Sequence, residues 1–258
     1  HGFAGNVALQ YLKHEFGNNE YRYQIWREGR ILRQMDTHTQ PLFCKVFTHP
    51  TELATPLMYR KSAAVVYMID RIIKSHLRKH LTKNLTDALS SNTTNARRIA
   101  TKQFLKQIGQ VEAEDLKPFA KCWIYGTGIP YFQSSFCYDA GRNLLEFVIK
   151  NDVQGIVQRL GNVTVRVNEH DDQHDYFMPV EESHNISDLR IRSKPRKKQR
   201  KKLQEENQSR IDIPIRWIRV DPDLNFIKMT RYKQTEVMWV QQLEKDRDVI
   251  AQIEALQA

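Results

Sequence analysis

Apolar residues in the first part of the chain recur with the spacing of amphipathic helices. Residues 3–28 place Phe3, Val7 and other apolar side chains on one face, which predicts a helix. Gly17 and the two asparagines that follow it are typical of a helix stop. We expect a second short helix to restart over residues 20–30, so the pattern predicts two helices separated by a break.

The clearest helical pattern follows a stretch that contains prolines. Residues 31–57 include three prolines that block a long helix, and we expect a loop there. Over residues 64–77, apolar side chains recur at i, i+3 and i+4 opposite basic ones, as in a helix half buried in a core. Two further helical segments are expected, one over residues 96–108 and one beginning over residues 115–119.

From Cys122 onward the pattern changes to aromatic and β-branched runs that are cut by turns. Val163, Val165 and Val167, for example, alternate with polar neighbours. The strand candidates are Trp123–Tyr125, Tyr131–Tyr138, Leu144–Ile149, Val163–Val167 and Tyr176–Val180. Several short strands at this spacing are typical of a β-sandwich.

The C-terminal stretch combines a strand, a turn and a helix. Trp217, Ile218 and Val220 form a short β-rich run, and residues 221–223 (Asp-Pro-Asp) form a turn with proline at its corner. After Gln234 the apolar residues take up helical spacing. We therefore expect a sheet to end here and a helical layer to begin.

These patterns together predict an α+β chain of three parts. The parts are a helical region at residues 1–118, a β-sandwich at 119–231 and a first helix of a further layer at 232–258. Residues 188–212 are rich in Lys, Arg, Gln and Glu, and we expect them to form a mobile insertion in the sandwich. The chain starts without Met and stops within a helical pattern, which favours a piece of a longer protein.

Positive charge is concentrated in one segment. The formal net charge is +10, and nine basic residues without an intervening acid account for most of it. They are Arg190, Arg192, Lys194, Arg196, Lys197, Lys198, Arg200, Lys201 and Lys202. This basic tract fits a nuclear-localisation signal, a sequence-independent contact with nucleic-acid phosphates, or a solvated linker. Aromatic residues are absent between Ile186 and Ile213, which disfavours base stacking.

Candidate metal and catalytic motifs are incomplete. His14 and Glu15 begin an H-E-x-x-H pattern, but Asn18 stands where the second histidine would be, so we expect no zinc site there. The histidines and aspartates over residues 170–175 are interpreted as an acidic turn. The sequence contains no P-loop, no dinucleotide-binding glycine set and no membrane-spanning apolar run. No catalytic residue, metal, cofactor or membrane contact is therefore expected.

Two motifs near the C-terminus resemble the subunit 2 family of the general transcription factor TFIID. Residues 217–223 read W-I-R-V-D-P-D, and residues 238–252 read M-W-x-x-Q-L-x-x-x-R-D-V-I-A-Q. The segment Gly17–Arg22 and the basic tract extend the resemblance, which covers nearly all of the chain and corresponds to the middle of those proteins. That family is similar in fold to zinc aminopeptidases of the thermolysin-like type. The resemblance implies the helical end of an aminopeptidase-like domain, then a β-sandwich, then the start of an α-helical solenoid.

The aminopeptidase relationship implies positions for two site residues. In those enzymes the glutamate of an N-E-G-F-A segment is the third zinc ligand, and here His1 precedes Gly2-Phe3-Ala4 in its place. Tyr59 takes the position of the tyrosine that stabilises the oxyanion. Zinc catalysis needs the complete ligand set to activate water, so we expect no working site and a packing role for Tyr59. An H-E-x-x-H helix upstream of this chain would reopen the alternative, an active zinc aminopeptidase.

The resemblance also implies a function for the chain. It implies a non-catalytic scaffold of TFIID in the nucleus, which supports core-promoter DNA binding and assembly of the RNA polymerase II pre-initiation complex. The implied partners are core-promoter DNA and other TFIID subunits, the TBP-associated factors, in a large hetero-oligomeric complex. The basic tract holds the candidate residues for DNA binding or nuclear localisation.

Overall fold

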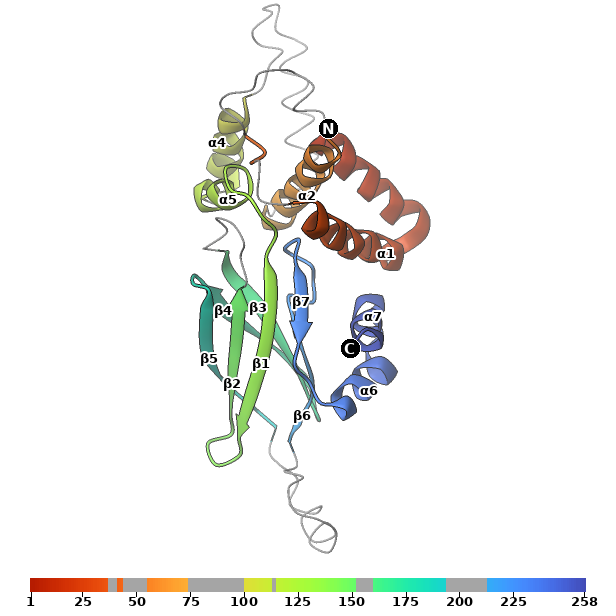
Figure 1. Ribbon diagram of the computed structural model, residues 1–258, viewed down its shortest axis with the longest axis vertical. Helices are drawn as coiled ribbons and strands as arrows, with labels where there is room; N and C mark the ends of the chain where they lie inside the picture. Colours follow the sequence, from red (N-terminus) through yellow and green to blue (C-terminus); the bar gives the residue numbers. More distant parts are fainter. Residues whose placement is uncertain (37–40, 44–54, 74–99, 113–114, 152–159, 194–212) are drawn as a thin grey trace, which may run out of the picture.

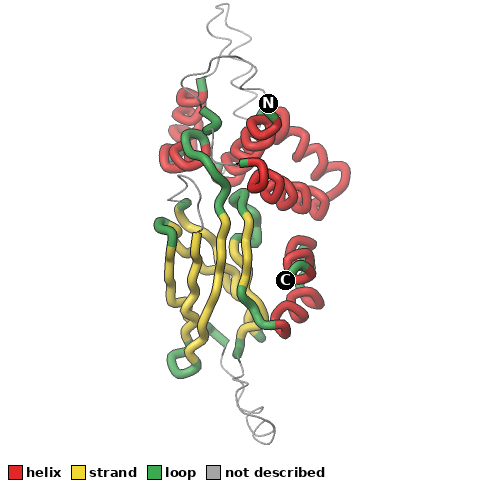
Figure 2. Tube along the Cα trace, in the orientation of Figure 1, coloured by secondary structure: helices red, strands yellow, loops and turns green. Residues whose placement is uncertain are grey.

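A computed structural model describes residues 1–36, 41–43, 55–73, 100–112, 115–151, 160–193 and 213–258. Within these residues the chain forms six helices and two β-sheets. The first four helices gather at one end of the two sheets, and the last two helices lie beside the sheets (Figure 1, Figure 2). The prediction of a mixed α+β chain is confirmed.

The N-terminal helix is interrupted where the sequence predicts. Helix α1 spans Gly2–Met35, and Gly17 inside it has φ 86° and ψ −179°, so the two halves run in different directions (Figure 1). Glycine adopts this backbone conformation at little cost because it has no Cβ. The second half of α1 continues to Met35, beyond the predicted end at Arg30. It does so because Leu32 is fully buried and its carbonyl accepts the N–H of Asp36. The predicted loop at residues 31–57 is therefore wrong at its beginning.

The second helix starts earlier than its apolar pattern indicates. Helix α2 spans Pro56–Ile72. Thr55 caps it, since its hydroxyl oxygen accepts the N–H of Met58 at 3.3 Å, and proline at the first helical position has its φ preset for a helix. The end of the helix predicted over residues 64–77 falls partly outside the described residues.

Two shorter helices complete the group. Helix α4 spans Thr101–Glu112 and helix α5 spans Lys117–Trp123. The strand predicted over residues 123–125 is wrong, because residues 124–125 form a turn and Trp123 is the last residue of α5. Its ring lies 6.5 Å from that of Phe119, one turn earlier on the same helix, and its side chain is buried in the core.

Seven strands form the two sheets of the described chain. They are β1 (Tyr131–Asp139), β2 (Leu144–Asn151), β3 (Gly161–Glu169), β4 (Gln173–Val180), β5 (His184–Arg190), β6 (Ile215–Val220) and β7 (Met229–Tyr232). One sheet has the order β5-β2-β1-β7 and the other the order β4-β3-β6. All neighbours are antiparallel except β1 and β7, which are parallel. Phe132, Phe147 and Val165 are buried in the common core, as in a sandwich.

Strand β5 is an element that the sequence pattern does not predict. Leu189 is its one buried residue, and Ile186 is exposed, so the alternation is weak. The strand is placed by pairing with β2 at the edge of the sheet. The predicted mobile insertion is wrong for residues 188–193, because β5 continues to Arg190 and Ile191 is only 2% exposed. Residues 194–212 lie outside the described part of the chain.

The C-terminal helical pattern is divided into two helices. Helix α6 spans Glu236–Lys245 and helix α7 spans Val249–Leu256. The expectation of one helix is wrong because Asp246 takes an extended conformation, with ψ 128°, and Asp248 then caps α7 by accepting the N–H of Ile250. None of the helices in the described residues is long and apolar enough to span a membrane.

Candidate functional site

The two positions that correspond to peptidase site residues lie next to each other. His1 directly precedes α1, and its ring meets that of Tyr59 on α2 edge to face at 4.2 Å between centroids. Among the residues that the structure describes, no three His, Cys, Asp or Glu side chains are grouped closely enough to hold a metal ion. The two rings form an edge-to-face aromatic contact, with Tyr59 37% exposed, and the packing role of Tyr59 stays a prediction.

The other histidine candidates lie on the surface. The His14 ring is 3.0 Å from the Glu15 carboxylate, and both side chains are exposed. Residues 170–172 connect β3 to β4, and the carbonyl of Asp172 accepts the N–H of Glu169 across this connection. The interpretation of the acidic cluster as a turn is confirmed for residues 170–172. It is wrong for His174 and Asp175, which belong to β4, where Asp175 pairs with Arg166 at 2.7 Å.

Of the basic tract, only Arg190 and Arg192 lie in the described residues. Both are exposed at the end of the sandwich that lies away from α2, where β5 ends and β6 begins (Figure 1). The buried Glu169 carboxylate holds this stretch, because it accepts the backbone N–H of Arg192 and that of Ser193. The remaining seven members of the tract fall outside the described residues.

The turn after β6 is built around one buried carboxylate. Asp221 has φ 47°, which is uncommon for a residue other than glycine. Its side chain accepts the N–H of Asn225 at 2.9 Å and that of Phe226 at 3.1 Å. It also pairs with Lys228, whose Nζ lies 2.8 Å from the carboxylate, and both side chains are buried. These bonds compensate for the strained backbone and give residues 221–226 one defined shape.

This turn connects the sheets to the N-terminal helices. The Tyr67 hydroxyl of α2 donates to the carbonyl of Leu224 at 2.6 Å, and burial raises the pKa of this phenol above its usual value. A guanidinium nitrogen of Arg22, on α1, donates to the carbonyl of Pro222 at 2.6 Å. Gly29 of α1 lies so close to the chain after the turn that an added Cβ would be 3.0 Å from the carbonyl oxygen of Lys228.

Two arginines connect the same turn to the C-terminal helices. Arg22 forms two hydrogen bonds with the Asp248 carboxylate, at 2.8 and 2.6 Å. Arg219, on β6, has a side chain that is 3% exposed, and it lies 2.8 Å from Asp248 and 2.9 Å from Glu254. Asp246 is a further carboxylate neighbour, at 3.8 Å. We call Arg22, Arg219, Asp246, Asp248 and Glu254 the junction network, because it joins α1, β6 and α7.

The pKa values in the junction network reflect the close pairing of its charges. Burial acts to lower the pKa of Arg219, but the Glu254 and Asp248 carboxylates outweigh burial and raise this pKa above its usual value. Burial acts to raise the pKa of Asp248, but the hydrogen bond and charge of Arg22, with the charge of Arg219, hold it below its usual value. Both groups are therefore charged at neutral pH.

A second buried ion pair connects the helices to the chain that leads into β1. Lys61 on α2 lies 2.7 Å from the carboxylate of Asp36, just after α1, and these side chains are 1% and 0% exposed. The same carboxylate accepts the N–H of Gly128 at 3.1 Å. Arg33 adds a hydrogen bond to the carbonyl of Ile129 at 2.8 Å. The start of the sandwich is thus fastened to both α1 and α2.

Sequence reasoning identified the motif at residues 217–223 but not the charged residues that make it function as a connection. Arg22, Arg219 and Lys61 were not singled out, because basic side chains are normally solvated. One signal was present for Arg219, since it stands between Ile218 and Val220 in a strand that is buried on both faces. A charged residue within such a strand indicates a buried partner.

The chain is similar to known proteins in both sequence and structure. The model of the family described as "TAF2 Ig-like domain" matches residues 127–235. Transcription initiation factor TFIID subunit 2 of Danio rerio is 28% identical over 299 residues, which cover 100% of this chain and 25% of that protein. The protein of the same name from Saccharomyces cerevisiae is 21% identical, with 99% of this chain and 24% of the relative covered. The chain thus spans about a quarter of the length of these curated relatives.

The structural likeness is to a peptidase. The crystal structure of Legionella pneumophila aminopeptidase A in complex with aspartic acid superposes with a TM-score of 0.65 at 14% identity, over 98% of this chain and 26% of that one. At this identity the likeness concerns the fold alone, and it supports the expected aminopeptidase-like architecture. Relatives from fish, bird and yeast share the name TFIID subunit 2 and align over almost the whole chain, so the chain is similar to these proteins along nearly all of its length.

Proposed function

We propose that the chain is a non-catalytic scaffold within TFIID. In this role it supports core-promoter DNA binding and assembly of the RNA polymerase II pre-initiation complex, in the nucleus and in contact with other TFIID subunits. The similarity to TFIID subunit 2 over the whole chain supports this proposal. The observation that carries it is the junction network, which joins α1, β6 and α7 through buried charges. A scaffold that holds its partners at fixed positions needs a stiff connection between its own structural elements.

The division into parts belongs to the same proposal. We place a helical, aminopeptidase-like part at residues 1–118, a β-sandwich at 119–231 and the start of a helical solenoid at 232–258. The solenoid proposal is supported by α6, where Val237, Val240 and Leu243 are exposed at helical spacing. An exposed apolar stripe of this kind is the surface on which a following helix packs in helical repeats.

The alternative function, an active zinc aminopeptidase, makes a different prediction for the full-length protein. We expect metal analysis of the purified protein to find no stoichiometric zinc, and test peptides to keep their N-terminal residues. The reason is that His1 stands in the position of the third ligand, a glutamate in the enzymes, and lies against Tyr59. Bound zinc together with release of N-terminal residues would overturn the scaffold proposal.

The DNA contribution of the basic tract can be tested by removing its charge. Replacing its nine residues by glutamine should weaken promoter-DNA binding, because basic side chains that neutralise phosphates release counterions. The plot of log affinity against log salt should become shallower by about 0.9 for each phosphate that the variant no longer neutralises. Filter binding or fluorescence anisotropy over a range of salt concentrations measures both quantities.

Four lysines on α4 and α5 provide a control for the removal of exposed positive charge elsewhere on the chain. Lys102, Lys106, Lys117 and Lys121 are exposed, so changing them to glutamine removes charge without disturbing the core. We expect this variant to keep the salt dependence of the unaltered protein. If the tract variant also keeps it, the tract has no role in DNA binding. A reporter fused to residues 188–205 would then test whether the tract directs the protein to the nucleus. If the reporter stays outside the nucleus, the tract is not a nuclear-localisation signal either.

A further inference from the structure

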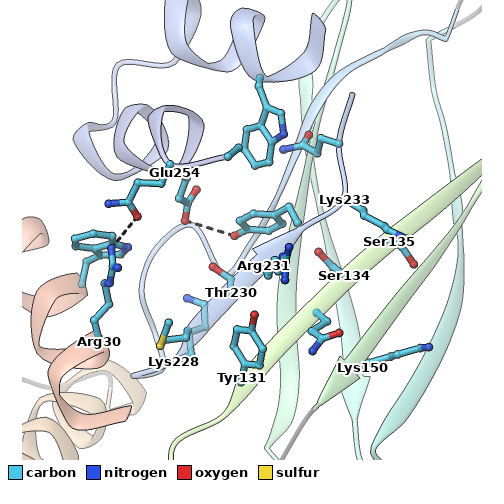
Figure 3. A pocket seen from close by; sticks show the side chains of 18 residues that line it. Arg30, Tyr131, Ser134, Ser135, Lys150, Lys228, Thr230, Arg231, Lys233 and Glu254 are labelled. Atoms are coloured by element: carbon cyan, nitrogen blue, oxygen red, sulfur yellow. Dashed lines mark hydrogen bonds between the residues drawn. The ribbon is translucent and has the colours of Figure 1, made fainter. Parts of the chain in front are cut away.

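A cleft of about 850 Å³ opens between the first sheet and the helices beside it. Its floor is formed by β1 and β7, including Tyr131 and Arg231 (Figure 3). Its side is lined by Trp26 and Arg30 of α1 and by residues of α6 and α7 such as Glu254. The helices α1 and α7 meet there, because Arg30 donates to the side-chain oxygen of Gln257 at 2.8 Å and the junction network also joins the two helices. We call this space the β7 cleft.

Basic side chains predominate in the β7 cleft. Arg30, Lys150, Arg231 and Lys233 line it, and none of them forms an ion pair with a described residue. The carboxylate of Glu254 also faces the cleft, but Arg219 already neutralises it. Positive charge that the protein leaves uncompensated in a concave site attracts an acidic ligand.

The basic groups are spaced along the strands and across them. Gln133 on β1 pairs in register with Lys150 on β2 and with Arg231 on β7, so the three residues form one row across the sheet. Neighbouring strands lie about 4.8 Å apart, which places the two basic positions of this row about 10 Å from each other. Lys233 follows two residues after Arg231, so the two side chains lie on the same face of the strand.

Strand β7 also offers backbone groups to the cleft. It is the edge strand of its sheet. The N–H of Met229 donates to the carbonyl of Pro130, just before β1, at 3.0 Å, and the N–H of Lys233 donates to the carbonyl of Ser134 on β1 at 2.9 Å. Backbone groups of alternate residues point in opposite directions along a strand, so those of Thr230 and Tyr232 face the open edge. Both residues line the cleft. An edge of this kind is a template for pairing with an added strand.

We propose that the β7 cleft binds an acidic segment of a partner polypeptide in extended conformation. The segment adds to the open edge of β7 through its backbone, and its carboxylates lie against Arg30, Lys150, Arg231 and Lys233. Trp26 and Trp239 provide apolar contacts for the side chains between the acidic ones. The open edge of β7 favours a polypeptide over duplex DNA, because DNA has no peptide groups with which the strand could pair. The proposal is independent of promoter binding by the basic tract.

The test measures binding of a labelled peptide of alternating glutamate and valine to the whole chain by fluorescence anisotropy. We expect binding in about 50 mM salt, where surface charges are weakly screened. The double variant R231E/K233E should weaken it by about tenfold or more, since both positions become repulsive. The control double variant K102E/K106E has the same net charge and changes two exposed residues on α4, so its affinity should stay within about twofold.

A second variant tests the backbone contribution. Thr230→Pro removes an N–H that faces the open edge, and proline is tolerated at such positions in edge strands. We expect weaker peptide binding with an unchanged circular dichroism spectrum. Three results would overturn the proposal. These are no binding of the peptide to the unaltered chain, equal losses in R231E/K233E and the α4 control, or a loss in R231E/K233E that affects duplex DNA and spares the peptide.

Discussion

Replacing Arg219 by methionine is expected to lower the free energy of unfolding by about 3–5 kcal/mol, the usual cost of removing one partner from a buried ion pair. The guanidinium is 3% exposed and lies within 2.9 Å of both Asp248 and Glu254. Methionine fills a similar volume, so little of the lost stability comes from a cavity. Most of it comes from the two carboxylates, which lose their ion pairs with Arg219. Glu254 in particular would be left in a partly buried place with no cation beside it. Urea denaturation followed by tryptophan fluorescence measures the change.

An exposed arginine supplies the control for Arg219. Arg142 lies 3.7 Å from Asp139, with side chains that are 78% and 53% exposed. Its replacement by methionine should change stability by less than about 0.5 kcal/mol, because water screens such pairs. Equal effects of the two substitutions would show that Arg219 does not hold the junction together.

The Arg219 variant should also respond differently to acid. Because the folded pKa of Asp248 is lowered, its contribution to stability is fully present above the unfolded pKa of about 3.9 and is lost as the pH falls through the folded value. Removing Arg219 removes one cause of the lowered pKa. The loss of stability below about pH 4 should therefore be less steep in the variant than in the unaltered protein.

The second large effect is expected for Asp36. Its replacement by alanine leaves Lys61, whose side chain is 1% exposed, without its carboxylate at 2.7 Å, and it removes the acceptor of the Gly128 N–H. We expect a loss of about 3–5 kcal/mol in the free energy of unfolding. The same denaturation experiment measures it.

A double substitution separates the buried charge from the packing at this position. Changing Asp36 to leucine and Lys61 to methionine together replaces the ion pair by apolar groups of similar size. Such replacements are often neutral or stabilising, so most of the lost stability should return. If the double variant is as unstable as Asp36→Ala, packing or the Gly128 hydrogen bond matters more than the unpaired lysine.

Local patterns accounted for most of the elements. Apolar periodicity placed α2, and the alternation of Val163, Val165 and Val167 placed β3, because both patterns follow from which face is buried. Strand β5 could not be found in this way, since it is held by backbone pairing with β2 and buries only Leu189. The division between α6 and α7 was also hidden, because Leu243 and Ile250 are seven residues apart, which is the spacing of one face of a continuous helix.

By itself the sequence determined the α+β class, the break at Gly17, the turn at residues 221–223 and the similarity to TFIID subunit 2. These features depend on backbone conformation and on short motifs, which a linear chain already contains. Only the tertiary structure decided which charges are buried and paired. Arg22 and Asp248 are 226 positions apart and Lys61 and Asp36 are 25 apart, and nothing in the local sequence distinguishes them from solvated residues. Their role arises because folding removes them from water together, and a buried charge is stable only beside its partner.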